Sequence, residues 1–269
     1  MNWKPALAWQ SKMKKYLEQL DKDLAGELYY NTSFEHQTQL LAYSTDASVY
    51  QEKPLAVALP SDINDIKLLI KFASLHKITL IPRAAGTSLA GQVVGNGIVV
   101  DVSCYFNRII EVNKEEKWVR VQPGVIRDDL NYALKPFGLM FGPETSTANR
   151  AMIGGMVGNN SCGLHSIVWG AVRDHLLEAS VILSDGSEVV FKDEALTHIP
   201  KKANFKDKIN SDIYQLLADD YNQKLIQANY PKDTVVRRNS GYALDSLIKL
   251  QPFATAGKPF NLCKLLAGS

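Results

Sequence analysis

The stretch Pro82-Arg83-Ala84-Ala85-Gly86-Thr87-Ser88-Leu89-Ala90-Gly91-Gln92 decides how this sequence is interpreted. It follows the apolar run at 78–81, which predicts a β-strand, and most of its side chains are small. Small side chains let several backbone N–H groups approach one anion, which is typical of loops that bind phosphate. The structural alternative is a permissive surface turn, because short glycine-rich connections are common.

Two common nucleotide-binding motifs do not fit this loop. Residues 86–91 have the spacing of a Walker loop, but Gln92 and Val93 stand where Lys and Ser or Thr are required. In Gly95-Asn96-Gly97 the third glycine position is Val100, and the segment leads into a strand instead of a helix. The sequence therefore disfavours a triphosphate site and the dinucleotide fingerprint of nicotinamide cofactors.

Strands and helices around the loop predict an α+β fold. An apolar stripe from Ile63 to Ala73, with Ser61 as N-cap, predicts a helix between strands at 57–59 and 78–81, which makes a small parallel unit. Mostly antiparallel structure with flanking helices follows. Its expected elements are an antiparallel meander of strands at 98–102, 108–112 and 118–122, a helix at 126–137, and a hairpin of 178–183 with 187–191 around Asp185-Gly186.

The same pattern predicts the domain organisation. Residues 1–50 are expected to form a helical extension that carries no site, in which 23–29 extends or follows the first helix. Residues 51–269 are expected to form one domain, with a first subdomain at about 51–112 and a second at about 113–269. The Lys-, Asp- and Asn-rich segment at about 193–235 is interpreted as a helical insertion in the second subdomain.

Composition excludes several classes of protein. The chain has 269 residues, and its 30 basic and 28 acidic side chains give a net charge of +2, too small for a nucleic-acid binder. Cys104, Cys162 and Cys263 form no C-x-x-C pair, and the histidines lack metal-ligand spacing, so no metal site is predicted. Neither a signal peptide nor a transmembrane segment is evident, and we expect a cytoplasmic protein.

A second stretch of small and hydrogen-bonding residues strengthens the case for a ligand. It contains Pro143-Glu144-Thr145, then Ile153-Gly154-Gly155, and then Asn159-Asn160-Ser161-Cys162-Gly163. The glycine pair permits close approach of a large planar or phosphorylated ligand, and the Asn and Ser side chains supply donors and acceptors. The segment 159–163 is one residue away from a G-x-S-x-G nucleophile elbow, but Asn159 occupies the first glycine position, so a serine hydrolase is disfavoured.

At these residues the chain resembles the flavin-binding domain of the vanillyl-alcohol-oxidase and p-cresol-methylhydroxylase superfamily, in particular its D-2-hydroxy-acid dehydrogenase and glycolate-oxidase branch. Residues 82–88 are similar to the loop around the FAD pyrophosphate, and 153–155 with 160–163 to the segment that lines the flavin. The resemblance covers about residues 50–269. The other similar segments are Gln122-Pro123-Gly124-Val125, Gly170-Ala171-Val172-Arg173-Asp174, Ser184-Asp185-Gly186 and Asn239-Ser240-Gly241-Tyr242-Ala243-Leu244.

The resemblance implies an FAD-dependent oxidoreductase that transfers a hydride equivalent from a D-2-hydroxy acid (D-lactate, D-2-hydroxyglutarate or glycolate class) to flavin. Thr87-Ser88 stand where flavin-linking relatives place a histidine, so FAD is expected to be non-covalent. The implied cofactor-binding residues are Pro82, Arg83, Ala84, Ala85, Gly86, Thr87, Ser88, Leu89, Gln92, Pro143, Glu144, Thr145, Gly154, Gly155, Asn159, Asn160, Ser161, Gly163 and Val181.

The resemblance also implies partners beyond this chain. The similarity is strongest to long bacterial members, in which an iron-sulfur region follows the flavin and substrate domains. The chain stops at Ser269, where the family continues with a final strand, so we expect a truncated fragment without that strand, the substrate domain or the catalytic base. We expect such a fragment to be inactive, to hold FAD weakly or lose it, and to leave the tail at 261–269 poorly paired. The full protein is expected to take a small 2-hydroxy acid and to pass electrons to a downstream acceptor.

Individual residues leave alternatives open. Arg83 is interpreted as neutralising the pyrophosphate, against the alternative of a surface charge. His165 is a weak catalytic candidate, because a histidine without a visible partner is more often a hydrogen-bonded structural group. A nucleotide-binding or interaction module without redox activity is the competing function, and a related reductase of cell-wall precursor synthesis is a further enzyme alternative.

Overall fold

The computed structural model describes residues 4–196, 203–235, 238 and 240–268, with side chains from Lys12 onward. Asn239, the first residue of the late motif, lies outside these ranges, as do residues 197–202 of the expected insertion. The chain forms two compact units: residues 1–139 with 149–155, and residues 140–148 with 156–269. The boundary expected near residue 112 falls inside the first unit.

A four-stranded sheet forms the centre of the first unit. Its order is β1 (Glu27–Tyr29), β2 (Ala56–Leu59), β4 (Ile98–Asp101) and β3 (Leu80–Arg83), with β1 antiparallel to β2, and β2 and β3 both parallel to β4. Helix α3 (Ile63–His76) connects β2 to β3, which confirms the parallel strand-helix-strand unit, with β4 inserted between its strands.

The position of β4 corrects the predicted meander. Ile98–Asp101 pairs with β2 and β3 and belongs to the parallel sheet, so the meander prediction is wrong for this strand. All residues of β4 are buried, as expected for a central parallel strand that is covered on both faces. The uninterrupted apolar run indicates that the strand is buried on both faces. The short spacing to the next strand does not indicate which strand it pairs with.

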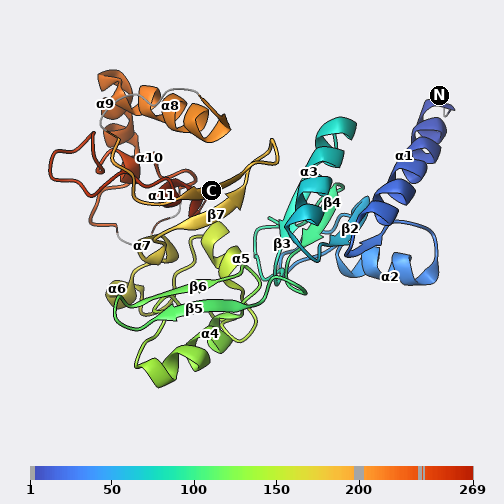
Figure 1. Ribbon diagram of the computed structural model, residues 1–269, viewed down its shortest axis with the longest axis horizontal. Helices are drawn as coiled ribbons and strands as arrows, with labels where there is room; N and C mark the ends of the chain where they lie inside the picture. Colours follow the sequence, from blue (N-terminus) through green and yellow to red (C-terminus); the bar gives the residue numbers. More distant parts are fainter. Residues whose placement is uncertain (1–3, 197–202, 236–237, 239, 269) are drawn as a thin grey trace. The chain divides into compact units, whose positions relative to one another are not determined.

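Helices cover both faces of the sheet (Figure 1). Alternate residues of β2 point to opposite faces, with Ala56 and Ala58 in one apolar cluster and Val57 and Leu59 in another. The first cluster includes side chains of α1 (Lys4–Asp23) and α3, and the second includes Leu40 of α2 (Phe34–Ala42). The unit is therefore a three-layer arrangement around a fully buried strand pair.

The N-terminus of α3 differs by one residue from the prediction. Asp62, and not Ser61, is the N-cap, because its carboxylate accepts hydrogen bonds from the N–H groups of Asn64 and Asp65 at 2.7 and 3.0 Å. Ser61 instead donates its hydroxyl to Oδ2 of Asp65 at 3.0 Å.

Residues 27–29 form a strand, which corrects the expected helix at 23–29. The buried carboxylate of Asp65 accepts hydrogen bonds from the N–H groups of Ala25 and Gly26, both at 2.9 Å. A Cβ on Gly26 would lie 2.1 Å from the carbonyl oxygen of Leu59, so glycine permits this close approach. The chain is thereby turned away from α1 and enters the sheet beside β2.

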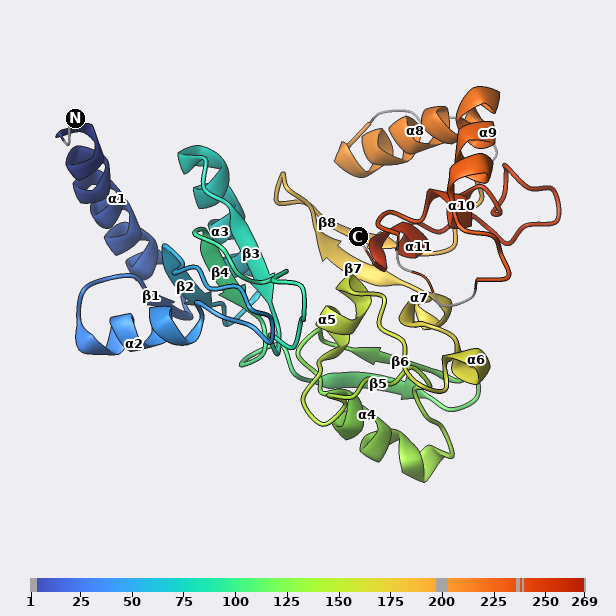
Figure 2. The ribbon, with the colours of Figure 1, turned by 180° about the vertical axis from the view of Figure 1, so that it is seen from behind.

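A hairpin and a helix complete the first unit (Figure 2). Strands β5 (Ile109–Asn113) and β6 (Trp118–Val121) pair antiparallel, as predicted for this part of the meander. The predicted helix at 126–137 is present as α4 (Arg127–Leu134) followed by the 3-10 turn η1 (Lys135–Phe137). Residues 149–155 also belong to this unit, and Met152 forms an isolated antiparallel bridge with Ile126.

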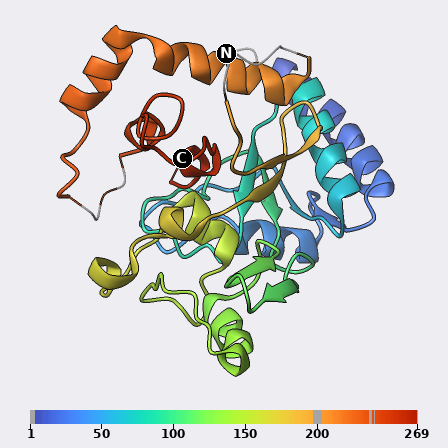
Figure 3. The same cartoon turned by 60° about the vertical axis from the view of Figure 1, so that its left-hand side comes forward.

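The second unit is built on the predicted hairpin. Strands β7 (Ala179–Ile182) and β8 (Glu188–Phe191) pair antiparallel, and Gly186 in the turn has a φ of 82°. Figure 3 shows α8 and α9 in orange as consecutive helices, which lie in the segment that we interpret as an insertion. The unit's helices are α6 (Ser166–Trp169), α7 (Val172–His175), α8 (Phe205–Ala218), α9 (Asp220–Asn229), α10 (Leu244–Leu247) and α11 (Cys263–Leu266), and α5 (Ile153–Gly158) runs into it from the first unit.

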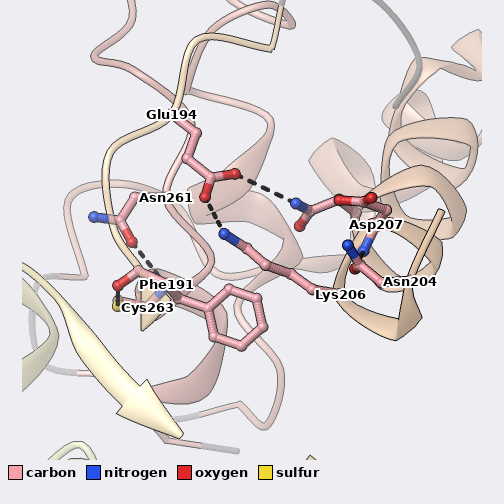
Figure 4. Close-up of polar contacts among 8 residues, drawn as sticks. Phe191, Glu194, Asn204, Lys206, Asp207, Asn261 and Cys263 are labelled. Atoms are coloured by element: carbon pink, nitrogen blue, oxygen red, sulfur yellow. Dashed lines mark hydrogen bonds and ion pairs between the residues drawn. The ribbon is translucent and has the colours of Figure 1, made fainter. Parts of the chain in front are cut away.

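Polar contacts attach the insertion and the tail to this hairpin (Figure 4). Glu194, after β8, pairs with Lys206 of α8 and accepts a hydrogen bond from Asn210 at 3.3 Å. Asn261 is buried and donates to the carbonyl oxygen of Leu177 at 2.8 Å and to Asp193 at 2.7 Å. These contacts connect the segment after residue 192 to the strand pair.

The tail from 261 onward corrects a prediction. We expected it to be poorly paired, but Leu262 and Cys263 are buried in the apolar core of the unit. The carbonyl oxygen of Ala267 accepts a hydrogen bond from Arg173, and the N–H of Gly268 donates to Val157 at 3.0 Å. The tail packs because it carries apolar side chains into the core and because a buried guanidinium satisfies its backbone.

Candidate functional site

The glycine-rich loop starts at the carboxyl end of β3, where ligands of open parallel sheets bind. Within the described residues, no backbone N–H from Ala85 to Leu89 donates a hydrogen bond to a protein atom. Side chains 84–88 are only partly buried, so these donors are not closed off by packing. A run of unpaired N–H groups on small residues fits an anionic phosphate group.

Contacts within the loop fix its shape. Gly86 has a φ of +63°, and a Cβ there would lie 2.5 Å from Nη2 of Arg83. The hydroxyl of Ser88 donates to Oε1 of Gln92 at 2.6 Å, and Leu89 is 82% exposed. Of the predicted site residues, Ser88 and Gln92 therefore bond to each other in this structure.

Two further segments meet this loop. The nearest atom to a Cβ built on Gly155 is the Cβ of Ala84, at 3.7 Å. Gly154 donates its N–H to the carbonyl oxygen of Pro123 at 2.8 Å, and a Cβ on Gly154 would lie 2.5 Å from that of Pro123. The structure thus links three segments that are far apart in the sequence. No side chain fits at Gly154, whereas Gly155 leaves room for a single Cβ in ordinary contact.

The other predicted residues lie in the second unit. Asn160 is buried with a φ of 45°, and its Oδ1 accepts a hydrogen bond from the N–H of Arg173 at 2.9 Å. Gly163 packs on Glu144, since a Cβ there would lie 2.1 Å from Cγ of Glu144. Asn159 donates to the hydroxyl of Ser161 at 3.5 Å. The segment 159–163 is consequently ordered by contacts within its own unit.

His165 has the partner that sequence alone did not reveal. Its Nδ1 lies 2.7 Å from Oε1 of Glu144, and its backbone N–H donates to the same oxygen at 3.0 Å. The side chain of His165 is 60% exposed. A carboxylate that orients an imidazole is compatible with proton transfer, but it equally anchors the turn before α6.

The remaining predicted residues play local roles. Pro143 is buried, and the carbonyl oxygen of Thr145 accepts a hydrogen bond from Ala148 at 3.1 Å. Val181 lies in β7 and packs against the apolar core of the second unit. Pro82 is an exposed residue of β3, and Thr87 is partly buried within the loop.

Sequence reasoning missed the residues that support the loop from the N-terminal segment. Tyr43 and Tyr50 belong to the range expected to carry no site, yet both contact the loop. Burial and the hydrogen bond to Asp101 raise the pKa of Tyr43, so its hydroxyl remains a donor at neutral pH. A pair of tyrosines shortly before the first parallel strand was the available signal, but it has no specific motif.

Burial lowers the pKa of two cations near the tail in the second unit. Arg173 is 9% exposed, and desolvation lowers its pKa, with the opposing effect of Asp245 second. Desolvation likewise lowers the pKa of Lys264, whose ammonium donates to the carbonyl oxygens of Arg173 and Leu176 at 2.8 and 3.0 Å. Both cations donate hydrogen bonds to backbone carbonyl oxygens, so we assign them a role in stabilising the fold.

Comparison with known families gives one match that covers the loop and both neighbouring segments. The FAD-binding domain family matches residues 54–192. The chain belongs to this family. The FAD-binding domain match includes every predicted cofactor residue, from Pro82 to Val181.

Named relatives of this FAD-binding domain are oxidoreductases. The chain is 37% identical over 235 residues to D-2-hydroxyglutarate dehydrogenase of Escherichia coli (strain K12), which covers 85% of this chain and 22% of that protein. It is 34% identical over 148 residues to glycolate oxidase subunit GlcD of Bacillus subtilis (strain 168), covering 54% and 32%. The chain thus spans about a fifth of the dehydrogenase.

Solved structures show the same fold for the FAD-binding domain. Alkyldihydroxyacetonephosphate synthase has a TM-score of 0.57 at 16% identity, covering 74% of this chain and 37% of that chain. For 6-hydroxy-D-nicotine oxidase of Arthrobacter nicotinovorans the TM-score is 0.54 at 20% identity, with coverage of 62% and 36%. The expected α+β FAD-binding fold is confirmed. Within the described residues, no helix has the length and apolar character needed to cross a membrane.

Proposed function

We propose that this chain is the FAD-binding part of a flavin-dependent dehydrogenase that oxidises a D-2-hydroxy acid. The observation that supports this most concerns the N–H groups from Ala85 to Leu89, which have no protein acceptor among the described residues and which follow Ala84, the residue that approaches Gly155. The family match and the names of the relatives agree with it. No comparison favours an interaction module without redox activity.

The geometry supports an assignment of the residues that would hold the cofactor. The loop 84–89 would bind the pyrophosphate through its N–H groups, and Gly154-Gly155 would permit close approach of the cofactor next to the loop. Bound FAD supplies the chemistry, accepting a hydride equivalent from the hydroxyl-bearing carbon of the substrate. The protein contributes binding, orientation and the polar surroundings of the loop.

The rest of the proposed enzyme lies in the larger part of such proteins that this chain does not span. We assign substrate recognition and the catalytic base to that part, together with the route to a downstream electron acceptor. An iron-sulfur region and a cytoplasmic location also remain proposals. D-lactate, 2-hydroxyglutarate and glycolate are the candidate substrates, and 2-hydroxyglutarate is favoured because that relative aligns over most of the chain.

Titration with FAD tests the proposal. With FAD in excess, we expect weak but saturable binding of the cofactor by calorimetry and the two visible absorption bands of a bound flavin whose electronic environment differs from water. AMP and ADP titrated in parallel separate the alternatives. A chain that binds ADP as tightly as FAD, without any change in the flavin spectrum, would favour the nucleotide-binding module.

Gly155→Val is expected to weaken FAD binding about tenfold or more, a factor that corresponds to about 1.4 kcal/mol. A branched side chain on Gly155 would press against Ala84, whose Cβ lies 3.7 Å from a Cβ built on Gly155, and would displace the start of the loop to which we assign the cofactor. Gly155→Ala, whose single Cβ makes only ordinary contacts at 3.7 Å, is the matched control for folding. Equal FAD affinity in the valine variant and the unmodified chain would contradict this placement.

Bound flavin is expected to be released completely by acid precipitation. Thr87 and Ser88 occupy the positions at which flavin-linking relatives carry a histidine, and neither side chain is a nucleophile of that kind. Fluorescence of the supernatant and of the washed pellet measures the partition. Flavin fluorescence that stays with the denatured chain would refute non-covalent binding.

A further inference from the structure

We propose that residues 43–51, which precede the family match at 54–192, are a positioning element of the cofactor site. We call this segment the loop clamp. It holds the glycine-rich loop in its phosphate-binding shape before any cofactor is present. The inference rests on the proposed function, because it assigns a role towards FAD.

Tyr43 is the first contact of the loop clamp. Its hydroxyl donates a hydrogen bond of 2.5 Å to Oδ2 of the buried Asp101, at the end of β4. The guanidinium carbon of Arg83 lies 5.0 Å from the centre of the Tyr43 ring, within range of a cation–π interaction. Tyr43 therefore bonds to the end of one parallel strand and stacks on the last residue of its neighbour.

Arg83 contacts both the loop clamp and the glycine-rich loop. Its Nη1 donates to the carbonyl oxygen of Thr45 at 2.8 Å and approaches that of Tyr43 at 3.5 Å. The other end of the guanidinium lies against the backbone of Gly86. With these bonds the guanidinium is directed at the loop clamp, so Arg83 acts on the cofactor site by supporting Gly86, which revises its interpretation as a direct neutraliser of the pyrophosphate.

Tyr50 is the second contact, at the far end of the loop. A Cβ on Gly91, which has a φ of +72°, would lie 2.6 Å from Cδ2 of Tyr50. The two tyrosines are joined by a closed turn, in which Thr45 and Gln51 form an antiparallel bridge and the N–H of Glu52 donates to Ser44 at 2.9 Å. The loop clamp thus touches the loop at both ends and leaves its centre open.

This arrangement has a thermodynamic consequence. Within the described residues, the N–H groups from Ala85 to Leu89 have no protein acceptor, so this part of the loop gains no order from hydrogen bonds that these groups donate. The Ser88–Gln92 hydrogen bond contributes to the shape of the loop, and Tyr43 and Tyr50 add contacts at its two ends. A loop that is already ordered loses little conformational entropy when the cofactor binds. The loop clamp therefore raises the affinity for FAD without contacting it.

The test compares FAD affinity by calorimetry in Tyr43→Leu, Tyr43→Phe and the unmodified chain. We expect Tyr43→Leu to weaken binding about tenfold, with a more unfavourable binding entropy, because FAD must then order the loop. Tyr43→Phe keeps the ring over Arg83 and is expected to recover most of this loss. Tyr105→Phe, which removes a hydroxyl that bonds to Glu27 away from the loop, is the matched control.

A second variant and a folding readout separate positioning from damage to the fold. Tyr50 is 59% exposed, so Tyr50→Ala is expected to fold normally and still to weaken FAD binding. Amide exchange of Leu69 and Ala73, buried residues of α3, reports on the fold of this unit and is expected to be unchanged in both loop-clamp variants. Unaltered FAD affinity in Tyr43→Leu and Tyr50→Ala would overturn the inference, whereas an unmodified chain that binds no FAD would overturn the proposed function itself.

Discussion

Gly86→Val is expected to weaken FAD binding by about 100-fold, a factor that corresponds to about 2.8 kcal/mol. Valine is strongly disfavoured at a φ of +63°, and its Cβ would meet the guanidinium of Arg83 at 2.5 Å. The loop must therefore change its backbone conformation, which moves the N–H groups that we assign to the pyrophosphate. Calorimetric titration with FAD measures the loss.

Gly138→Val is the matched control for this prediction. Gly138 has a φ of +69° in the turn after η1, and a Cβ there has no atom within 4 Å. The substitution introduces the same kind of backbone strain in the same unit but away from the loop. Equal losses of FAD affinity in the two variants would show that general destabilisation, and not loop geometry, explains the effect.

Asp65→Ala is expected to destabilise the attachment of the N-terminal segment by about 1–3 kcal/mol, because partly buried N–H groups lose the acceptor that holds them. The carboxylate accepts hydrogen bonds from the N–H groups of Ala25, Gly26 and Ser61, and it is buried. Accelerated amide exchange in β1 measures the loss. Asp62→Ala removes an exposed N-cap of the same helix and is expected to cost only about 1 kcal/mol.

The same carboxylate predicts a pH dependence. Burial acts to raise the pKa of Asp65, but hydrogen bonds from Ala25, Ser61 and Gly26 outweigh it and hold the pKa below the ordinary value of 3.8. A carboxyl whose pKa is lower in the folded chain stabilises the fold above its unfolded pKa. We therefore expect protection of β1 to be constant near neutral pH and to be lost as the pH falls below 3.8. Protection of β1 that is unchanged in Asp65→Ala would contradict both expectations.

Local patterns predicted much of the fold. The apolar stripe of α3, the Asp185-Gly186 hairpin and the helix at α4 were recognisable because each depends on nearby residues. The position of β4 in the sheet was not recognisable. Whether a short apolar strand pairs in parallel or antiparallel depends on strands that lie far away in the sequence. The strand at 27–29 was missed for the same reason, since the buried Asp65 directs it from another element.

The candidate site divides in a similar way. The glycine-rich loop and Gly154-Gly155 were predictable because close backbone approach restricts the choice of residue, and the structure brings them together. Tyr43 and Tyr50 were not predictable, because a tyrosine that supports a loop carries no spacing rule. The pairing of His165 with Glu144 also depends on tertiary contact, across residues that no motif connects.

The central position of β4 also determines the order in which the sheet closes during synthesis. β2, α3 and β3 leave the ribosome first, and until residues 98–101 follow them, the facing edges of β2 and β3 have no strand between them. Such open edges invite pairing with other chains. The glycine-rich loop is part of the covalent connection between β3 and β4, so a nascent chain that has emerged only as far as residues 84–97 is expected to need chaperone protection more than one that has emerged beyond residue 101.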